Sequence, residues 1–537
     1  MVVGRGRPVY EGVAIGRIYV RTKEKELVDR KCSDIEKELK RFEEAKETAR
    51  AELSALYDKT AAEIGEEQAA IIEVQSLFLE DLDYLEGIEA MIKSGSDAAF
   101  SVHEIGDAQA SAFAALDDEY MKARATDVRD ISDRLIRILT GADQGFRMDE
   151  PGIIVAEDLT PSETVALDKD KILAFVTRQG SSNSHTAILA RVMNIPSLVL
   201  TDIDIDPSLN GKLMIVDGFS GNYYIEPDEK TLSEMKAKQK SAGEYKAGLE
   251  QYRGKESVSR KGRKVKLFAN IGSPSDIKYV IDGDAEGIGL LRSEFLYLGR
   301  DDFPKEDELF EAYRTVLEAM NGKKTVIRTL DIGADKKVAY FNLDAEENPA
   351  LGYRGIRICL TQKDIFRTQL RAIYRASAYG NAAIMFPMII SVGEVREIKA
   401  FCKEIQDELH AEGIKTGDVE LGIMIETPAA AIISDQLAHE VDFFSVGTND
   451  LTQYTLAIDR QNEKLDAFYD AHHPAIMRLL EMIASNAHQA GIWAGICGEL
   501  AGDLSLIDEF LKMGYDELSV APSRILELRK NVINSEV

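Results

Sequence analysis

The stretch LGIMIE (421–426) is a short apolar run that ends in a carboxylate. Similar runs recur along the second half of the chain, separated by helix-like segments: KLFANI (266–271), GIGLL (287–291), TVIRTL (325–330), AAIMFPM (382–388), FFSVG (443–447), WAGICGE (493–499) and ELSVA (517–521). Nearly continuous apolar runs indicate strands that are buried on both faces, as in parallel sheets covered by helices. Eight such runs alternating with helices predict a (β/α)8 barrel over residues 256–537.

Polar residues stand at the ends of these predicted strands. They are Arg292 after the second run, Arg328 in the third, Glu426 at the end of the fifth, Asn449 and Asp450 after the sixth, and Cys497 in the seventh. Barrels of this kind carry their chemistry at the carboxyl ends of the strands. The spacing therefore predicts a candidate site at that end of the barrel.

The residue types at this end suggest an anionic substrate and a hard cation. The guanidinium groups of Arg292 and Arg328 can bind phosphate or carboxylate through two parallel hydrogen bonds. Glu426 and Asp450 offer the few oxygen ligands that Mg²⁺ takes when substrate and water complete its shell. The alternative is a network of structural arginine–carboxylate ion pairs, which the clustering at five strand ends makes the weaker interpretation.

Cys497 has two possible roles. A single cysteine on a strand is usually a small core residue, whereas a thiol at a strand end facing anions can act as a general acid. The spacing leaves both possibilities open.

His185 lies in GSSNSHTAILAR (180–191), between a loop-like cluster and the start of a predicted helix. The positive end of a helix dipole disfavours imidazolium, so this ring is expected to be neutral near pH 7. A neutral imidazole that becomes anionic on phosphorylation suits such a position. The alternative is that His185 only caps the helix.

The composition indicates an ordinary soluble protein with several domains. The chain has 537 residues and a net charge of -28, which argues against binding to nucleic acid. No segment resembles a signal peptide or approaches the ~18 apolar residues of a membrane span. The four cysteines are scattered without CxxC spacing, so neither zinc nor disulfides are predicted. We expect a cytoplasmic protein without direct membrane insertion.

In the first half of the chain, a helical sequence pattern lies between two regions of strand-like pattern. Strand-like runs near residues 1–20 and 145–226 predict an α/β domain, and the helical pattern between them predicts an inserted helical domain at 21–144. Residues 227–255 are polar and favour a connecting helix with little apolar face.

Six motifs together resemble the family of phosphoenolpyruvate-protein phosphotransferase, Enzyme I of the bacterial sugar phosphotransferase system. They are SHTAILAR (184–191), GIGLLRSEFLY (287–297), RTLDIGADK (328–336), GIMIETPAA (422–430), SVGTNDLTQYTLAIDR (445–460) and CGELAGD (497–503). Residues 116–135 resemble the helical domain of that family, so the likeness covers essentially the whole chain. It implies a phosphohistidine α/β domain that swivels, an inserted helical domain that binds the carrier protein HPr, and a phosphoenolpyruvate-binding barrel.

The resemblance also implies a role for each matching residue. His185 would attack the phosphorus of phosphoenolpyruvate, and Cys497 would give a proton to the departing enolate of pyruvate. Glu426 and Asp450 would hold Mg²⁺. The implied substrate-binding residues are Arg292, Arg328, Asn449, Asp450 and Arg460, with Arg354 in the same cationic shell.

The implied reaction is the first step of sugar uptake. The phosphoryl group would pass from phosphoenolpyruvate through His185 to a histidine of HPr, and pyruvate would be released. The family acts as a homodimer that associates through its barrels. Because one histidine must meet both partners, we expect its domain to swing about the connector at 227–253.

Two other interpretations compete with this one. Pyruvate phosphate dikinase and phosphoenolpyruvate synthase share the phosphohistidine domain and the barrel, but they also carry an ATP-binding domain, for which this chain has neither the motif nor the length. A regulatory paralogue that binds HPr without turnover is the second, and it would not need all of His185, Glu426, Asp450 and Cys497.

Overall fold

The computed structural model describes most of the chain in two compact units, Met1–Ala247 and Gly248–Val537. The residues that it does not describe are 22–28, 30, 33, 64–75, 77, 115–118, 142–147, 160–166, 168–170, 181–185, 188–189, 191–194, 299, 301, 334–337, 345 and 461.

The first unit contains a mixed sheet. Its strands are β1 (Val2–Arg5), β2 (Arg7–Tyr10), β3 (Val13–Arg21), β4 (Gly152–Ala156), β5 (Ile172–Thr177), β6 (Ser197–Val199), β7 (Leu213–Asp217) and β8 (Asn222–Ile225). Their spatial order is β1-β8-β7-β3-β4-β5-β6-β2, with β3, β4, β5 and β6 parallel to one another. Pro8 lies in β2 at the edge of this sheet, where its missing N–H costs no ladder hydrogen bond.

A helical segment interrupts this sheet in the sequence. The described helices between β3 and β4 are α1 (Ile35–Glu63), α3 (Leu82–Lys93), α4 (Ala98–Ala114) and α5 (Glu119–Thr140), and they share their own apolar core. The helix α5 ends at Gly141, whose φ of +64° suits a residue without Cβ. Since β3 and β4 are paired in parallel across this insertion, the helices are inserted into the α/β fold as predicted.

The connecting segment is helical. Helix α8 (Glu229–Leu249) has no buried residue, as its polar sequence predicted. Its middle contacts the sheet of the first unit, because Lys238 Nζ donates to Asp217 Oδ2 at 2.6 Å and Gln239 Nε2 donates to the carbonyl of Val13 at 2.8 Å.

The second unit is a closed parallel barrel. Its described strands are β9 (Lys266–Ile271), β10 (Ile288–Arg292), β11 (Thr325–Arg328), β12 (Ala382–Phe386), β13 (Glu420–Ile425), β14 (Phe443–Val446), β15 (Trp493–Ile496) and β16 (Glu517–Val520), with β16 paired to β9. Each strand coincides with one of the apolar runs, so the predicted barrel and fold class are confirmed.

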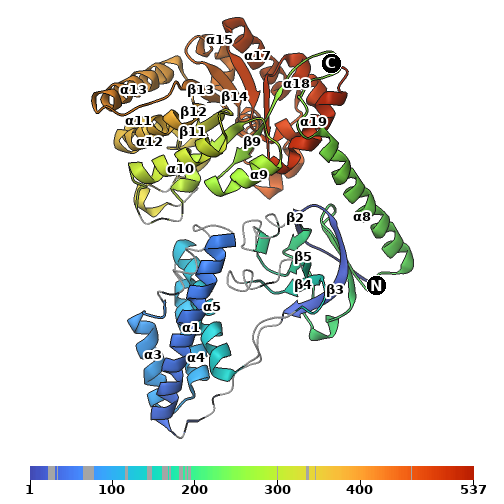
Figure 1. Cartoon of the computed structure of the whole chain (residues 1–537), viewed down its shortest axis with the longest axis vertical. Coiled ribbons are helices and arrows are strands. Elements are labelled where there is room, and N and C mark those ends of the chain that lie inside the picture. The colour runs from blue at the N-terminus through green and yellow to red at the C-terminus, as the bar shows by residue number, and fades with distance from the viewer. Residues whose placement is uncertain are drawn as a thin grey trace. The chain divides into compact units, whose positions relative to one another are not determined.

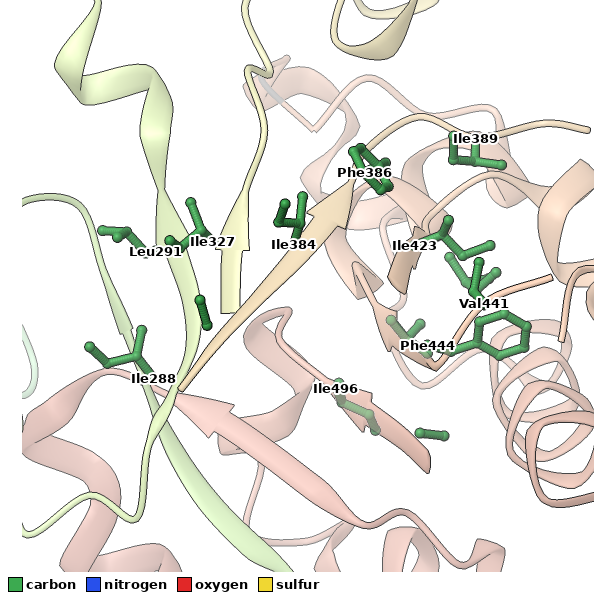
Figure 2. Packing of buried hydrophobic residues seen from close by; sticks show 14 of the residues in the cluster. Ile288, Leu291, Ile327, Ile384, Phe386, Ile389, Ile423, Val441, Phe444 and Ile496 are labelled. Carbon is green, nitrogen blue, oxygen red and sulfur yellow. The ribbon is translucent and has the colours of Figure 1, made fainter. Parts of the chain in front are cut away.

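Helices surround the barrel strands (Figure 1). They are α9 (Ile277–Asp282), α10 (Glu306–Ala319), α11 (Ile356–Thr361), α12 (Lys363–Ala376), α13 (Val392–Ala411), α14 (Pro428–Ile432), α15 (Ser434–Leu437), α16 (Thr448–Leu456), α17 (Pro474–Ala490), α18 (Ile507–Met513) and α19 (Ile525–Asn534). Alternate residues of the strands, such as Ile327, Ile384 and Phe444, pack outward against these helices in the main core (Figure 2).

The other face of each strand fills the barrel. An apolar cluster of Leu290, Val326, Met385, Met424 and Phe443 includes Cys497. Burial on both faces explains why the runs are nearly free of polar residues.

Two details of the first unit differ from the sequence prediction. The strand-like pattern near residues 1–20 did not show where the strands end, and β2 and β3 are separate strands on either side of Glu11 and Gly12, with β2 paired to β6. Strands β1 and β8 were not predicted, because they are too short to show alternation. The domain boundaries at residues 20, 144, 226 and 255 stay predictions.

Candidate active site

The carboxyl end of the barrel gathers the candidate residues of the second unit. Arg292 and Arg328 are the last residues of β10 and β11, and Glu426 directly follows β13. Asp450 lies in the first turn of α16, and Cys497 directly follows β15. The parallel strands therefore place these groups at one end of the barrel, although they are far apart in the sequence.

Arg328 is buried among carboxylates. Its Nη2 donates to Glu294 Oε1 at 2.5 Å, and its Nη1 lies 3.0 Å from Asp331 Oδ2. Burial opposes the charge on this side chain, but Glu294 and Asp331 outweigh it and raise the pKa of Arg328 above its usual value. The guanidinium is therefore a fixed cation.

Asp331 joins a second arginine to this cluster. Arg354 Nη2 lies 3.0 Å from each carboxylate oxygen of Asp331 and 3.4 Å from Asp450 Oδ2. Burial opposes the charge of Arg354, but Asp331 and Asp450 raise its pKa. The arginine–carboxylate network that the sequence left as an alternative is thus present, and it holds two guanidinium groups in fixed positions.

Glu426 is a buried carboxylate with a strained backbone neighbour. Its Oε1 accepts the N–H of Met388 at 2.6 Å, and Met388 has a φ of +59°, a costly region for a residue with a side chain. Burial, together with the nearby charges of Asp331 and Asp450, raises the pKa of Glu426 to about 8. The charges of Arg328 and Arg354 lower this pKa but do not offset burial and the two carboxylates.

One carboxylate oxygen of Asp450 accepts no hydrogen bond within the described structure and lies next to an arginine. Its side chain is buried, and Oδ1 makes no hydrogen bond with any described residue, although Arg460 Nη2 lies 3.4 Å away. Within the described ranges no cluster of three or more His, Cys, Asp or Glu side chains could hold a metal by itself. The carboxylates of Glu426 and Asp450 are two hard oxygen ligands, which fit Mg²⁺ when it takes its remaining ligands from substrate and water.

The Cys497 thiol is buried with a pKa that keeps it protonated. Its side chain is 3% exposed, and its Sγ lies 3.7 Å from the carbonyl oxygen of Val446. Burial raises the pKa of this thiol to about 12, against a smaller lowering by the Ser445 hydroxyl. The thiol therefore carries a proton at neutral pH, as a general acid requires, even though it also packs within the barrel core.

A cavity of about 410 Å³ opens beside these groups. Its lining includes Asn449 and Arg460, with Tyr469 and Glu499. The Oδ1 of Asn449 accepts the backbone N–H of Glu499 at 3.0 Å, which leaves the amide N–H₂ group as a donor. Arg292 is exposed at the end of β10. Arg328 and Arg354 are therefore largely buried and held by carboxylates, whereas Arg292 and Arg460 are exposed to solvent.

His185 lies outside the described residues, as do its neighbours 181–184. Thr186 and Ala187, which follow it, are helical and fully buried. The role of His185 therefore stays a prediction from the sequence.

Sequence reasoning missed the residues that orient the arginines. Glu294 and Asp331 were not singled out, although each lies two or three positions after an arginine at a strand end. Tyr454, one turn after Asp450, has its hydroxyl 3.3 Å from Arg354 Nη1. Gln369 accepts from the Leu330 N–H at 3.0 Å and so fixes the loop after β11. The short spacing of Glu294 and Asp331 after these arginines offered a signal, whereas the contacts of Gln369 and Tyr454 join distant segments.

Comparisons with known proteins agree with this architecture. Three family models match: the N-terminal domain of PEP-utilising enzymes over residues 5–124, their mobile domain over 148–221, and their PEP-binding domain over 246–537. Together with the barrel and the arginines at the carboxyl ends of its strands, these matches place the chain in the class of PEP-utilising enzymes.

Similar proteins identify the family within this class of enzymes. A phosphoenolpyruvate-protein phosphotransferase of Bacillus subtilis is 44% identical over 97% of this chain and 92% of its own length. Those of Priestia megaterium and Staphylococcus aureus are 43% and 42% identical, and both matches cover 98% of this chain and 93% of the relative. The chain belongs to the phosphoenolpyruvate-protein phosphotransferase family.

Proposed function

We propose that this chain transfers the phosphoryl group of phosphoenolpyruvate to its own His185 and then to a histidine of HPr, with release of pyruvate, as the first step of sugar uptake. The family membership supports the donor and the protein acceptor. The observation that carries the substrate site is the set of arginines held by Asp331 at the carboxyl end of the barrel.

The arginines would bind the two anionic groups of the substrate. Arg328 and Arg354 are pre-oriented, so little ordering is lost when phosphate or carboxylate binds. Arg460 and Asn449, which line the cavity, and the exposed Arg292 would complete the shell. Mg²⁺ bound to Glu426 and Asp450 would neutralise charge on the substrate oxygens. Phosphoryl transfer gains most from such positioning and charge neutralisation.

The chemistry then needs one nucleophile and one acid. The neutral imidazole of His185 would form a bond to phosphorus as the bond to the enolate oxygen breaks. Cys497 would give its thiol proton to the methylene carbon of the enolate, which yields pyruvate and a thiolate. HPr would later take the phosphoryl group and restore the imidazole.

We propose that the first unit swings about helix α8. Contacts of Lys238 and Gln239 attach the middle of this helix to the first unit. After the helix, Arg253 and Gly254 donate to Asp282 and Asp284 of the second unit. The pivot would therefore lie between residues 240 and 252. A covalent crosslink between the units should stop phosphorylation of HPr while exchange between pyruvate and phosphoenolpyruvate continues.

We propose a homodimer formed through the barrels. Exposed apolar side chains of the second unit support this, namely Leu351, Ile432 and Phe468, at 64%, 64% and 69% exposure. Replacing Ile432 by Glu should shift the mass measured by sedimentation toward the monomer. Among the described helices none is long and apolar enough to cross a membrane, and a cytoplasmic location stays a proposal.

Label transfer from radioactive phosphoenolpyruvate tests the function. Wild type with Mg²⁺ should take up an acid-labile, base-stable label that HPr then removes, and His185→Ala should take up none. Label that stays on the protein would exclude HPr as the acceptor. The absence of label on wild type would favour a regulatory paralogue, and transfer to ATP would favour a dikinase.

A further inference from the structure

The backbone that carries the Cys497 thiol continues beyond the paired part of its strand. Cys497 directly follows β15, whose pairing with β16 ends at Ile496 and Leu518. On the β14 side, the carbonyl oxygen of Val446 accepts the N–H of Cys497 at 3.1 Å and the N–H of Gly498 at 3.3 Å. The segment with the thiol is therefore past the β15–β16 ladder but still bound to β14.

A side chain from β9 also binds this backbone. Asn270, the residue before the last of β9, donates through Nδ2 to the carbonyl oxygen of Cys497 at 3.0 Å. The same nitrogen donates to the carbonyl oxygen of Ser519 in β16 at 3.1 Å. Because β16 lies between β15 and β9 in the closed barrel, the amide joins the ends of three strands.

The orientation of the Asn270 amide is itself fixed. The Ser519 side chain is fully buried, and its Oγ donates to Asn270 Oδ1 at 2.6 Å. An amide turned over would place its oxygen against two carbonyl oxygens and its nitrogen against the hydroxyl. Only one orientation therefore satisfies the contacts to Cys497 and Ser519 together.

Fixing this backbone largely fixes the thiol. A cysteine side chain has one torsion between Cα and sulfur, with three staggered positions, so the place of Sγ follows from the backbone and that torsion. In this structure Sγ lies 3.7 Å from the carbonyl oxygen of Val446. Val446 and Asn270 hold the Cys497 backbone at its N–H and at its carbonyl group, respectively.

A general acid must lie within hydrogen-bond reach of the atom that it protonates. We infer that Asn270 is a positioning residue, which keeps the Cys497 thiol aimed at the methylene carbon of the enolate. This inference rests on the proposed function, in which Cys497 is the proton donor. Asn270 itself gives up no proton and acts only through the backbone of Cys497.

Asn270→Leu tests the inference, because leucine has a similar shape but no N–H to donate. In a single turnover of the full chain with ³²P-phosphoenolpyruvate and Mg²⁺, pyruvate formation should slow by about tenfold, since small displacements of a reacting group are costly. Label should appear on the protein at nearly the wild-type rate. Asn486→Leu is the matched control: it removes a hydrogen bond of 2.8 Å to Ser434 in the outer helices, and neither rate should change.

A double-mutant cycle separates positioning from a structural role. In Cys497→Ala the thiol is already absent, so adding Asn270→Leu should slow pyruvate formation little further. Ser519→Ala is a milder variant, which frees Asn270 Oδ1 and should separate label from pyruvate in the same direction. It provides the test if Asn270→Leu does not fold.

Equal slowing of label and pyruvate in Asn270→Leu would mean a structural role and would overturn the inference. A full additional loss in the Cys497→Ala background would overturn it too, as would wild-type pyruvate formation in both Asn270→Leu and Ser519→Ala. Unchanged pyruvate formation in Cys497→Ala would remove the thiol from the reaction, and the inference with it. Absence of label from wild type would instead remove the proposed function itself.

Discussion

Asp331 and Arg354 are joined through both carboxylate oxygens, each 3.0 Å from Arg354 Nη2. The same carboxylate lies 3.0 Å from Arg328, so one acidic side chain orients two of the cations proposed to bind the substrate. An ion pair of this kind is a means of positioning, since each buried guanidinium would otherwise be free to turn or to pair elsewhere.

Replacing Asp331 by Asn should lower kcat/KM for phosphoenolpyruvate about a hundredfold, because a guanidinium displaced by roughly 1 Å no longer matches the substrate anions. The loss of one partner from a buried pair should also reduce the free energy of unfolding by about 3 kcal/mol. Steady-state kinetics and urea unfolding measure the two effects. Glu440→Gln is the control, since Glu440 pairs with the exposed Arg396 at 2.8 Å and should change neither quantity appreciably. Equal effects of the two variants would contradict a special role for Asp331.

Replacing Cys497 by Ala should slow pyruvate formation by about a hundredfold or more, because the enolate must then take its proton from water. The rate of His185 phosphorylation should fall less. In a single-turnover experiment, phosphoryl label should therefore appear on the protein faster than pyruvate is formed. Cys402→Ala is the matched control: this thiol is also buried, with its pKa raised to about 12 by burial, but it lies in α13 outside the barrel. If the two variants behave alike, the thiol proton of Cys497 is not used.

The raised pKa of Glu426 predicts a pH dependence of the metal-free protein. Burial and the charges of Asp331 and Asp450 raise this pKa to about 8, whereas in the unfolded chain it is about 4.3. The folded state therefore holds the extra proton, and its stabilising contribution is complete below about pH 4 and is lost as pH rises through about 8. Urea unfolding without Mg²⁺ should show lower stability at pH 8.5 than at pH 6, and the difference should shrink in Glu426→Gln.

The affinity for Mg²⁺ should rise with pH, whereas the stability of the metal-free protein falls, because Mg²⁺ competes with the proton on Glu426. Affinity measured by calorimetry should rise about fivefold between pH 7 and pH 8 in wild type. Affinity that stays constant over this range would exclude Glu426 as a ligand that titrates there.

Replacing Phe444 by Ala should destabilise the barrel by about 3–5 kcal/mol, since this ring is fully buried between the strands and their helices (Figure 2). Thermal unfolding of the full chain measures the loss. Ile281→Ala, at a site that is 56% exposed, should change stability by less than about 0.5 kcal/mol.

Much of the barrel and part of its site could be predicted from the sequence. Strands such as Ala382–Phe386 are buried on both faces, so each appears as an apolar run that needs no knowledge of its neighbours. Glu426, Asp450 and Cys497 stood out because each interrupts or follows such a run. By contrast, strands β1 and β8 are only 4 residues long, and their pairing depends on contacts more than 200 positions apart in the sequence.

By itself, the sequence determined the order of the elements, the family, and the residue types at the strand ends, because these follow from local patterns of burial and from whole motifs. Only the tertiary structure decided which charges meet. Arg328 contacts Glu294 across 34 positions of sequence, and Glu517 lies over Gly495 because two strands happen to be neighbours in the barrel. The pKa values of these groups depend on burial and on the charges of distant segments, and both exist only once the chain has closed into a barrel.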